Sequence, residues 1–477
     1  MTDSQIPALV GKKTTALDEL RAFMSERQAA RTGVKDFETF EREARRRFAA
    51  AEAEFVAEEL ARLDTDVPAV EVDGVPHRRV LRCSQTYMTA AGPASIERTL
   101  YSTRQDGERA VCPMELRAGV VAGYFTPLAA QNAAWMVAHL TPGESEELLV
   151  RMGGMCPSKS SLDRLAKALS ARWEADRIDF EKRLRDQETV PAAAVVVAVS
   201  LDGVLIPMKD GQRQKKCAAT RARGKLAKGP TGYNEASCGT LMFYDGVGEL
   251  LLTRRIARMP ESGKPTLKAS LTAELMTILA RRPDLRVVTI ADGARDNWAF
   301  LGTLPDGHAG YQIVDFFHAA EHLAEAMVAV HGEGTVRFTV EFEKHRHILR
   351  HDTDGVEKVI RHLRYLAKHH RRNRKVISAL GYFRHHRHRM RYASFSRRHL
   401  PIGSGIVEAA CKTLVAQRLK RSGMRWRHDG GQAILTLRAL EQSDRFDRAW
   451  RMLAATYVQV VRLPDNIVDI ASRRHPK

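Results

Sequence analysis

The chain has 477 residues, 44% of them hydrophobic, which is enough for two or three domains with buried cores. Its 76 lysines and arginines exceed its 57 acidic residues and give a formal net charge of +19. This charge favours a polyanionic partner, most simply nucleic acid, and a highly charged solvated surface is the other interpretation. The longest apolar run, near residues 192–199, is shorter than the roughly 18 residues of a membrane span, so we expect no membrane partner.

The first residues lack an apolar signal core, and the cysteines lie singly with no CxxC pair among them. These features predict a cytoplasmic protein with free thiols in a reducing compartment, and they argue against a disulfide framework or a cysteine zinc site. The cysteines are Cys83, Cys112, Cys156, Cys217, Cys238 and Cys411.

Residues 15–63 are rich in Ala, Glu and Arg with helical periodicity, which predicts one or two exposed amphipathic helices in an N-terminal segment, residues 1–66. From residue 67 to about residue 120 the pattern changes to short β-prone pieces. The pair Asp106 and Gly107 between two of these pieces indicates a hairpin turn. We therefore expect a mainly α N-terminal region that carries a small β module.

Residues 125–175 turn helical again. Thr141 and Glu144 form a capping box that opens one helix, Gly153 ends it, and Ser158 is the expected N-cap of the next. Two helices joined at glycines outline a helix-turn-helix, so we interpret residues 67–190 as the β module plus a DNA-binding region; an ordinary helical hairpin is the alternative. The second helix has Leu162, Leu165 and Leu169 on one face and the candidate DNA-binding residues Lys159, Ser160, Arg164 and Lys167 towards the other side.

The stretch over residues 192–211 carries one acid in an apolar setting. An apolar, β-branched run ends at Asp202, turns at Gly203 and continues as a second apolar run, residues 204–208, which predicts a buried hairpin. A carboxylate at the end of a fully apolar strand is costly unless a partner such as a metal ion compensates it. Asp202 is therefore expected to have such a partner.

The order of the following elements predicts an α/β fold with an RNase H-like core. Residues 209–237 form a basic loop, either a solvated connector or a phosphate-binding loop, and strands follow at 238–244 and 249–258. A helix at 266–280 precedes two short buried strands, 285–291 and 311–314, which lead into Asp292 and Asp315. This β-β-β-α-β-α-β order defines the first part of the core, residues 191–331.

Residues 332–400 are helical and very basic, and we expect them to form an insertion into the core. Aromatic residues interleaved with Arg and His suit contact with a nucleic-acid backbone plus base stacking. The alternative is that these aromatics face the core of the insertion itself. They are Tyr365, Tyr382, Phe383, Tyr392 and Phe395.

Residues 401–477 are expected to complete the core with a long helix and further C-terminal helices. Ser404 is a candidate N-cap for that helix, Glu408 lies in its first turns, and Lys412 lies one turn further on the same side. Candidate DNA-binding residues follow near and beyond its end: Arg418, Lys420, Arg421, Arg425 and Trp426.

Three of the acids form a candidate catalytic set. The first and fourth strands of an RNase H-like sheet are neighbours, so Asp202 and Asp292 should lie close together, and Glu408 from a packed helix can join them. Three adjacent carboxylates repel, and two Mg²⁺ or Mn²⁺ ions would neutralise them while activating an attacking hydroxyl and stabilising the leaving oxygen of a phosphodiester. Asp315 ends the fifth strand, further from Asp202, and Asp296 lies beyond the turn, so Asp292 is preferred.

Taken singly, each acid also has an ordinary structural explanation. Asp-Gly is a common turn, and a glutamate near a helix N-terminus is favoured by the helix dipole. Their combination in this strand order and with this net charge favours catalysis.

Four blocks of the sequence resemble the motif blocks of bacterial insertion-sequence DDE transposases, most closely the ISKra type. They are VSLDGVLIPMKDG, IADGARDNW, DFFHAAEHL and PIGSGIVEAACKTLVAQRLKRSGMRW, within about residues 195–440, with a less specific upstream likeness in MGGMCPSKSSLDRL. The resemblance implies that Asp202, Asp292 and Glu408 are the DDE acids, and it places His318 and His322 in a supporting role, to which we add Lys412.

The same resemblance implies hydrolytic nicking at transposon ends, which exposes a 3′-OH that attacks target DNA. It also implies double-stranded DNA as the partner, both element ends and target, a homo-oligomer on that DNA, and a nucleoid-associated location in a bacterial cytoplasm.

Two other functions fit parts of the sequence. A domesticated DNA-binding protein without catalysis would keep the basic surface and lose cleavage. His318, Glu321 and His322 also fit the H-x-x-E-H pattern of a zinc peptidase, with Glu408 as a third ligand. That peptidase interpretation leaves Asp202 and Asp292 unexplained.

Overall fold

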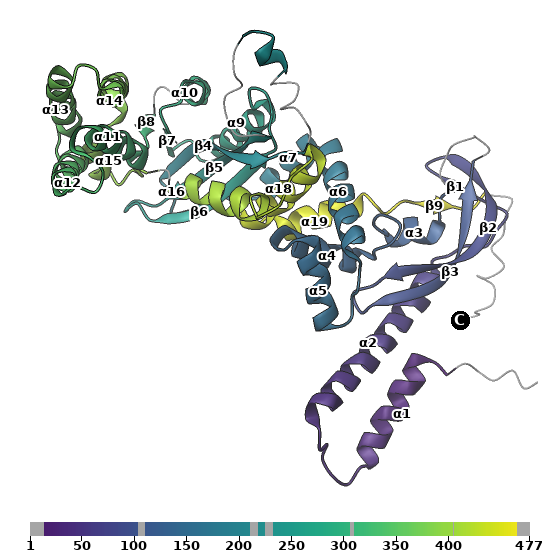
Figure 1. Cartoon of the computed structure of the whole chain (residues 1–477). Coiled ribbons are helices and arrows are strands. Elements are labelled where there is room, and N and C mark those ends of the chain that lie inside the picture. The colour runs from purple at the N-terminus through teal and green to yellow at the C-terminus, as the bar shows by residue number, and fades with distance from the viewer. Residues whose placement is uncertain are drawn as a thin grey trace, which may run out of the picture. The chain divides into compact units, whose positions relative to one another are not determined.

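The structure is a computed structural model that describes residues 14–103, 110–209, 218–224, 232–305, 310–403 and 405–464. The chain divides into two compact units, an N-terminal unit of Met1–Arg172 with Trp450–Lys477 and a core unit of Trp173–Ala449 (Figure 1). Several predicted features lie outside the described residues: the turn at Asp106 and Gly107, most of the basic loop, the cap Ser404 and the C-terminal tail.

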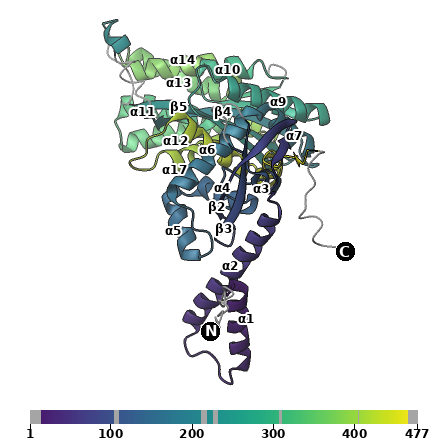
Figure 2. The same ribbon diagram turned by 90° about the vertical axis from the view of Figure 1, so that its right-hand side faces the viewer.

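Two exposed helices open the N-terminal unit, as the periodicity predicts. They are α1 (Ala16–Ala29) and α2 (Phe37–Arg62), and both views show them side by side (Figures 1 and 2). Thr15 and Asp18 form a capping box at the start of α1, and the Asp36 side chain caps α2. Few of their residues are buried, so the pair is held together mainly by contacts such as the Phe23–Phe40 ring stack at 5.8 Å.

The small β module is a four-stranded sheet in the order β3-β2-β1-β9. Its first turn lies at Asp73 and Gly74, whose positive φ values of 50° and 78° suit a tight two-residue hairpin. The sequence interpretation missed this turn. The fourth strand comes from the far end of the chain, a segment assigned above to the core. The strands are β1 (Ala69–Val72), β2 (Val75–Met88), β3 (Pro93–Ser102) and β9 (Val461–Arg462).

The predicted pair of helices follows as α5 (Pro142–Met152) and α6 (Lys159–Ala175), after α3 (Pro113–Ala118) and α4 (Pro127–His139). The capping box is present, with the Glu144 amide donating to Thr141 Oγ1 at 3.1 Å, and the Ser161 amide donates to Ser158 Oγ at 3.2 Å. The leucines expected on one face are buried. Residues 153–158 separate the helices, a longer connection than the three to four residues typical of a helix-turn-helix.

The core unit contains a five-stranded mixed sheet in the order β6-β5-β4-β7-β8. The first three strands along the chain pair antiparallel, whereas β7 and β8 run parallel to β4. The predicted adjacency of the first and fourth core strands is confirmed, and the order is consistent with an RNase H-like core. The strands are β4 (Val196–Pro207), β5 (Tyr233–Tyr244), β6 (Leu250–Arg258), β7 (Arg286–Ala291) and β8 (Tyr311–Val314).

The predicted hairpin at Gly203 is wrong. Strand β4 is one 12-residue strand that passes through Asp202 and Gly203 and pairs with β5 along its whole length. Gly203 serves close approach rather than a turn, because a Cβ there would lie 2.2 Å from the Glu235 carboxylate. Residues 204–208 therefore continue the first core strand, and the second begins at Tyr233, inside the segment predicted to be a loop.

Helices cover the sheet and complete the buried core. Leu271 of α9 contacts the sheet at Gly239, whereas Cys238, next along the strand, packs with Cys411 and Leu414 in a second apolar cluster. Neighbouring strand residues point to opposite faces, so these helices cover the two faces. Besides α9 (Pro265–Arg281), the helices of the core unit include α7 (Arg177–Gln187), α10 (Arg295–Leu301), α11 (Phe316–His331) and α18 (His428–Gln442). Helix α19 (Phe446–Ala455) begins in the core unit and ends in the N-terminal unit. Among the described residues, no helix has the length and apolar character needed to cross a bilayer.

The segment predicted as an insertion is helical, and its aromatics lie mostly in its interior. Phe383 and Tyr392 are fully buried and Phe395 nearly so, whereas Tyr365 is 59% exposed. Base stacking by the three buried rings is therefore contradicted, because they fill the apolar core shared with the sheet. The insertion comprises α12 (Val336–His351), α13 (Gly355–His369), α14 (Arg374–His386), η1 (Arg387–Arg389) and α15 (Tyr392–Ser396).

Candidate active site

Three aspartates lie level with one another on adjacent strands of the core sheet. Strand pairing joins Ser200 to Ile290, so Asp202 and Asp292, each two residues further on, are at matching positions. Pairing of Ala291 with Val314 likewise brings Asp292 level with Asp315, whose amide donates to the Ala291 carbonyl at 3.0 Å. The parallel register of β4, β7 and β8 thus gathers Asp202, Asp292 and Asp315 at one edge of the sheet.

Asp292 is held in place by the start of α10. Its Oδ1 accepts hydrogen bonds from the Ala294 amide and the Asn297 side-chain amide, both at 3.0 Å. Its backbone carbonyl accepts one from Trp298 Nε1 at 2.6 Å. Asp292 and Asp202 line the same cleft, which has a volume of about 1010 Å³. Lys264, Lys268 and Asp296 also line this cleft.

Asp202 is a carboxylate in an unfavourable setting. Burial raises its pKa, and the nearby charge of Asp292 raises it further, against the opposing effect of the hydrogen bond from the Gly203 amide. The Cys411 thiol also hydrogen-bonds Asp202 and contacts Cys238, the cross-strand partner of Asp202. A cation bound beside Asp202 would stabilise its ionised form and so oppose the effects that raise its pKa.

A second group joins the sheet edge to the helix beyond the insertion. Ligand atoms of Asp315, His318 and Glu408 all lie within 4.8 Å of one another. His318 Nε2 lies 3.9 Å from Glu408 Oε1, while the buried Asp315 accepts a hydrogen bond from the His318 amide at 2.8 Å and so caps α11. The Phe316 amide donates to the Ile402 carbonyl at 3.0 Å, which brings the chain before Glu408 to the start of α11.

The predicted helix that carries Glu408 is present and contains an irregular middle. It runs as α16 (Gly405–Ala410), the π-helical segment η2 (Cys411–Ala416) and α17 (Gln417–Leu419). This helix packs against β4 and β5. A π-helical segment departs from regular hydrogen bonding and is frequent at functional sites. The predicted supporting residue Lys412 is exposed on this segment.

Tyr382 of α14 is a site residue that sequence reasoning assigned elsewhere. Burial raises its pKa, and the charges of Asp292 and Asp315 add to this effect. A Cβ on Gly293 would lie 2.2 Å from the Tyr382 ring, so only glycine permits this close approach next to Asp292. The His322 ring lies against the same ring with centres 3.9 Å apart and planes tilted by 36°, and burial lowers the pKa of His322. A peptidase-like set is not assembled among the described residues, because His318 and Glu408 group with Asp315 rather than His322.

The predicted DNA-binding residues are exposed to different degrees. On α6, Lys167 forms an ion pair with Asp163 at 2.8 Å. Arg418 is 1% exposed and its guanidinium lies 5.5 Å from the Trp426 ring centre, so both brace the segment after α17. Trp426 further pairs its backbone with the end of β4, accepting from the Lys209 amide at 2.7 Å. Arg421 is partly buried, and the residues that face solvent are Lys159, Ser160, Arg164, Lys420 and Arg425.

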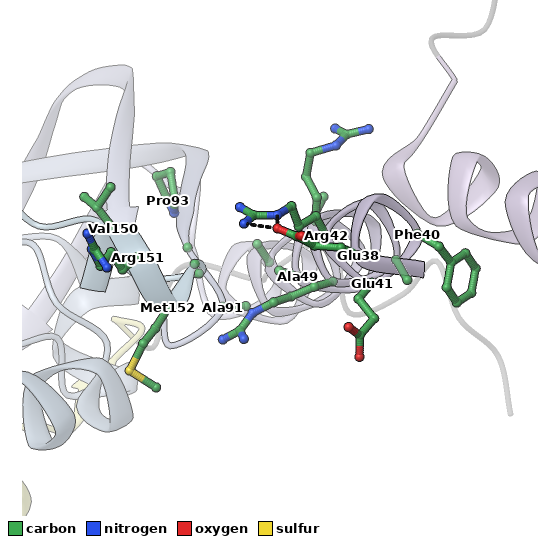
Figure 3. Close-up of a pocket in the computed structure, with 18 of the residues that line it drawn as sticks. Glu38, Phe40, Glu41, Arg42, Ala49, Ala91, Pro93, Val150, Arg151 and Met152 are labelled. Atoms are coloured by element: carbon green, nitrogen blue, oxygen red, sulfur yellow. Dashed lines mark hydrogen bonds and ion pairs between the residues drawn. The ribbon is translucent and has the colours of Figure 1, made fainter. Parts of the chain in front are cut away.

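A second large cleft lies wholly within the N-terminal unit (Figure 3). It has a volume of about 1100 Å³ and is lined by α2, the turn between β2 and β3 and the end of α5. Its charged lining is rich in arginine: Arg42, Arg45, Arg46 and Arg151, with Glu38 paired to Arg42 at 2.6 Å. Glu41 also lines the cleft and Arg46 pairs with Glu43, so much of this arginine charge is already balanced, and the described lining has no row of carboxylates like that at the core sheet edge.

Comparisons with known proteins add little to this geometry. Neither a protein-family model nor a curated protein matches the sequence. Among solved structures, the chain is similar to the Drosophila P element transposase strand transfer complex, with 13% identity and a TM-score of 0.25. That alignment covers 75% of this chain and 84% of the other. A TM-score this low supports no argument about the fold, so the fold assignment rests on the strand order. The likeness to ISKra-type transposases rests on the four motif blocks.

Proposed function

We propose that the protein is a DNA transposase of the ISKra type, which cuts and joins phosphodiester bonds at the ends of an insertion sequence. The observation that supports this proposal best is the row of carboxylates at the edge of the core sheet. In the proposal, Asp202, Asp292 and Glu408 are the catalytic acids, and the net charge of +19 attracts the DNA.

The donor set suits divalent metal ions. Carboxylate oxygens are the ligands that Mg²⁺ prefers. His318 beside Glu408 offers a nitrogen ligand, which Mn²⁺ accepts more readily than Mg²⁺ does. The raised pKa of Asp202 fits a position that a cation neutralises. Asp202, Asp292 and Glu408 would hold two such ions, which when bound activate the attacking hydroxyl and stabilise the leaving oxygen.

The protein's own residues have defined parts in this proposal. Asn297 orients the Asp292 carboxylate through its side-chain amide. His318 lies against Glu408 and can orient that carboxylate or accept a proton beside it. Lys264 and Lys268 line the cleft next to the acids and would contact the DNA phosphates there.

Cleavage of DNA tests the proposal. The substrate is linear DNA with the sequences that flank the gene, labelled at one strand, with Mg²⁺ or Mn²⁺ added. We expect Asp202→Asn, Asp292→Asn and Glu408→Gln each to lower the nicking rate at least about 100-fold, since each removes a ligand charge.

Asp296→Asn is the matched control, because Asp296 lines the same cleft but lies outside the row of acids and is exposed. It should retain most of the nicking rate. Full activity in all three acid variants would refute the proposal. Salt-sensitive DNA binding by the wild type without any cleavage would instead indicate a DNA-binding protein that lacks catalysis.

A further inference from the structure

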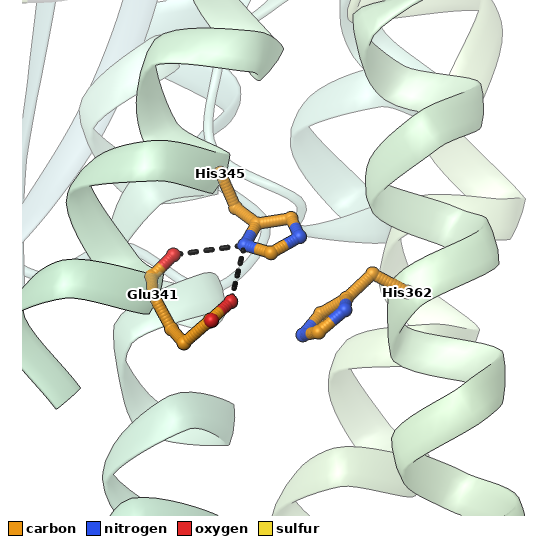
Figure 4. Close-up of side chains that lie close together, drawn as sticks. All are labelled: Glu341, His345 and His362. Carbon is orange, nitrogen blue, oxygen red and sulfur yellow. Dashed lines mark hydrogen bonds and ion pairs between the residues drawn. The ribbon is translucent and has the colours of Figure 1, made fainter. Parts of the chain in front are cut away.

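We propose a second metal site, for a transition-metal ion of the Zn²⁺ class, at Glu341, His345 and His362 in the helical insertion (Figure 4). Glu341 and His345 lie one turn apart on α12, and His362 lies on α13. Their ligand atoms are all within 4.8 Å of one another. This site belongs to a different set of residues from the carboxylates at the sheet edge.

The three side chains gather in one place but are not yet at the spacing of a tetrahedral site. Ligand atoms about 2.1 Å from a zinc ion lie about 3.4 Å from each other. His345 Nδ1 lies 3.5 Å from Glu341 Oε2 and donates to the Glu341 backbone carbonyl at 2.8 Å, so Nε2 is the nitrogen of His345 that would bind the ion. The imidazoles of His345 and His362 stack with centres 3.8 Å apart. Figure 4 shows the three side chains converging between the two helices. Ion binding would therefore require the side chains to rotate until their ligand atoms, now within 4.8 Å of one another, are about 3.4 Å apart.

The hydrogen-bonding state of the histidines favours a ligand. The His362 Nε2 atom is buried and has no hydrogen-bond partner among the described residues, and the same holds for Nε2 of His331 at the end of α11. An unpaired buried polar atom is costly unless something else satisfies it. His331 is not one of the three residues whose ligand atoms lie within 4.8 Å of one another, so the protein supplies three ligands and water would complete the coordination.

The chemistry of the donors selects the class of ion. Two imidazoles and one carboxylate suit Zn²⁺ and its transition-metal neighbours, whereas Mg²⁺ prefers oxygen ligands alone. The neutral imidazole is the form that binds metal. A bound ion would pin α12 to α13. Since α12 also packs against α11, which carries His318, the ion would stiffen the support of the sheet edge.

Zinc binding by the full-length, untagged protein tests the inference. Metal-free protein is titrated with ZnCl₂ against a chromophoric chelator, and the rise in Tm with ZnCl₂ is measured alongside. We expect His362→Gln to weaken zinc binding at least about tenfold and to abolish the rise in Tm. Co²⁺ should give the visible absorption bands of a tetrahedral site in the wild type and lose them in this variant.

Two controls separate this site from others. His347→Gln alters an exposed histidine on the same helix and should leave binding unchanged. Glu408→Gln should also leave this zinc site intact, so a failed transposase proposal and a failed zinc site give different results. If His362→Gln does not fold, Glu341→Gln at a partly exposed position replaces it. Zinc affinity and cobalt spectra that are unchanged in a folded variant would overturn the inference.

Discussion

Asp202 shows how a single residue can be unfavourable for stability and well suited to metal binding. It lies in the middle of β4, between a fully buried stretch and Gly203, and burial with the charge of Asp292 raises its pKa. The folded protein therefore holds this proton more tightly than the unfolded chain does. The contribution of Asp202 to stability is largest below its ordinary pKa of 3.8 and is lost as the pH rises through the raised folded value.

The first prediction at this scale is that Asp202→Asn stabilises the metal-free protein at neutral pH. Loss of the buried charge should raise the Tm by about 2–4 °C for each kcal/mol by which the free energy of unfolding increases. Thermal scans in a chelator from pH 4 to pH 8 should show a gain that grows with pH. Mg²⁺ should stabilise the wild type but not the variant. An equal Tm at every pH would contradict this account of Asp202, and Asp296→Asn is the control.

Asp315 allows a second test of a single residue. It is fully buried, caps α11 and lies in the group with His318 and Glu408. Asparagine caps a helix as well as aspartate does, so Asp315→Asn should keep the cap and remove only the charge. We expect an unchanged Tm and metal-dependent DNA cleavage about tenfold slower. Cleavage at the wild-type rate would limit Asp315 to its capping role.

At the level of residues, the sequence singles out the three candidate acids but not all of the residues around them. Asp202, Asp292 and Glu408 could be named because apolar strands and a helix start mark them. The strand order makes Asp315 a weaker candidate, because β8 is further than β7 from Asp202. In the structure, however, the chain before Glu408 lies beside the end of β8, so Asp315 and Glu408 come together. Tyr382 could not be placed, because its position depends on how the insertion folds back to Gly293.

At the level of elements, periodicity predicted the helices well, and turn signals were less specific. The capped start of α5 and the leucine face of α6 follow from local patterns. The pair Asp202 and Gly203 has the composition of a turn, but pairing with β5 along its length keeps it extended. Local chemistry alone does not distinguish these outcomes, because the deciding contact is with Glu235 in another strand.

A buried ionic network joins four elements of the core unit. Arg445 donates to Glu188 at 2.7 Å and to Glu274 at 2.8 Å, and Arg254 lies 3.0 Å from Glu188 and 3.4 Å from Glu274. Their side chains are at most 6% exposed. Burial alone would raise the pKa of Glu188, but the hydrogen bond and charge of Arg445 and the charge of Arg254 outweigh it, so the net pKa is lowered. The network therefore favours both charged forms together.

We predict that Glu274→Gln lowers the stability of the core unit by about 3–5 kcal/mol, because it leaves arginine charge buried without its partner. Denaturant unfolding at pH 7 measures this loss. The stabilisation from Glu188 should be present above its ordinary pKa of 4.5 and be lost as the pH falls below it. Asp179→Asn, which breaks an exposed ion pair with Arg183, should cost less than about 1 kcal/mol. A similar cost for both variants would contradict the role of the network.

For the whole molecule, the N-terminal unit is built from both ends of the chain. Strand β9 pairs with β1, and Val461 and Leu463 pack on the cluster of Val70, Val72 and Tyr101. The sequence placed residues 401–477 with the core, and the true partner could not be seen, because a two-residue strand carries no periodic pattern. Pairing at such long range is set by the folded sheet and not by local sequence.

Removal of residues 458–477 tests this arrangement. We expect the shortened chain to lose stability in the N-terminal unit while the core unit keeps its own unfolding transition. Hydrogen exchange should show faster exchange in β1, above all at Glu71 and Val72, which pair with β9. Unchanged protection of the β1 amides in the shortened chain would contradict the pairing of β1 with β9. A loss of stability confined to the core unit would contradict it as well.

The position of β9 also matters while the protein is being made. Arg462 follows Val72 by 390 positions, so β1 leaves the ribosome long before its partner strand does. At roughly 5–20 residues per second, the delay is about 20–80 s. Throughout that interval the growing chain presents an unpaired strand edge, which is a template for pairing with another chain on the same messenger RNA. Strand β9 therefore covers this edge only after residues 461–462 have been synthesised.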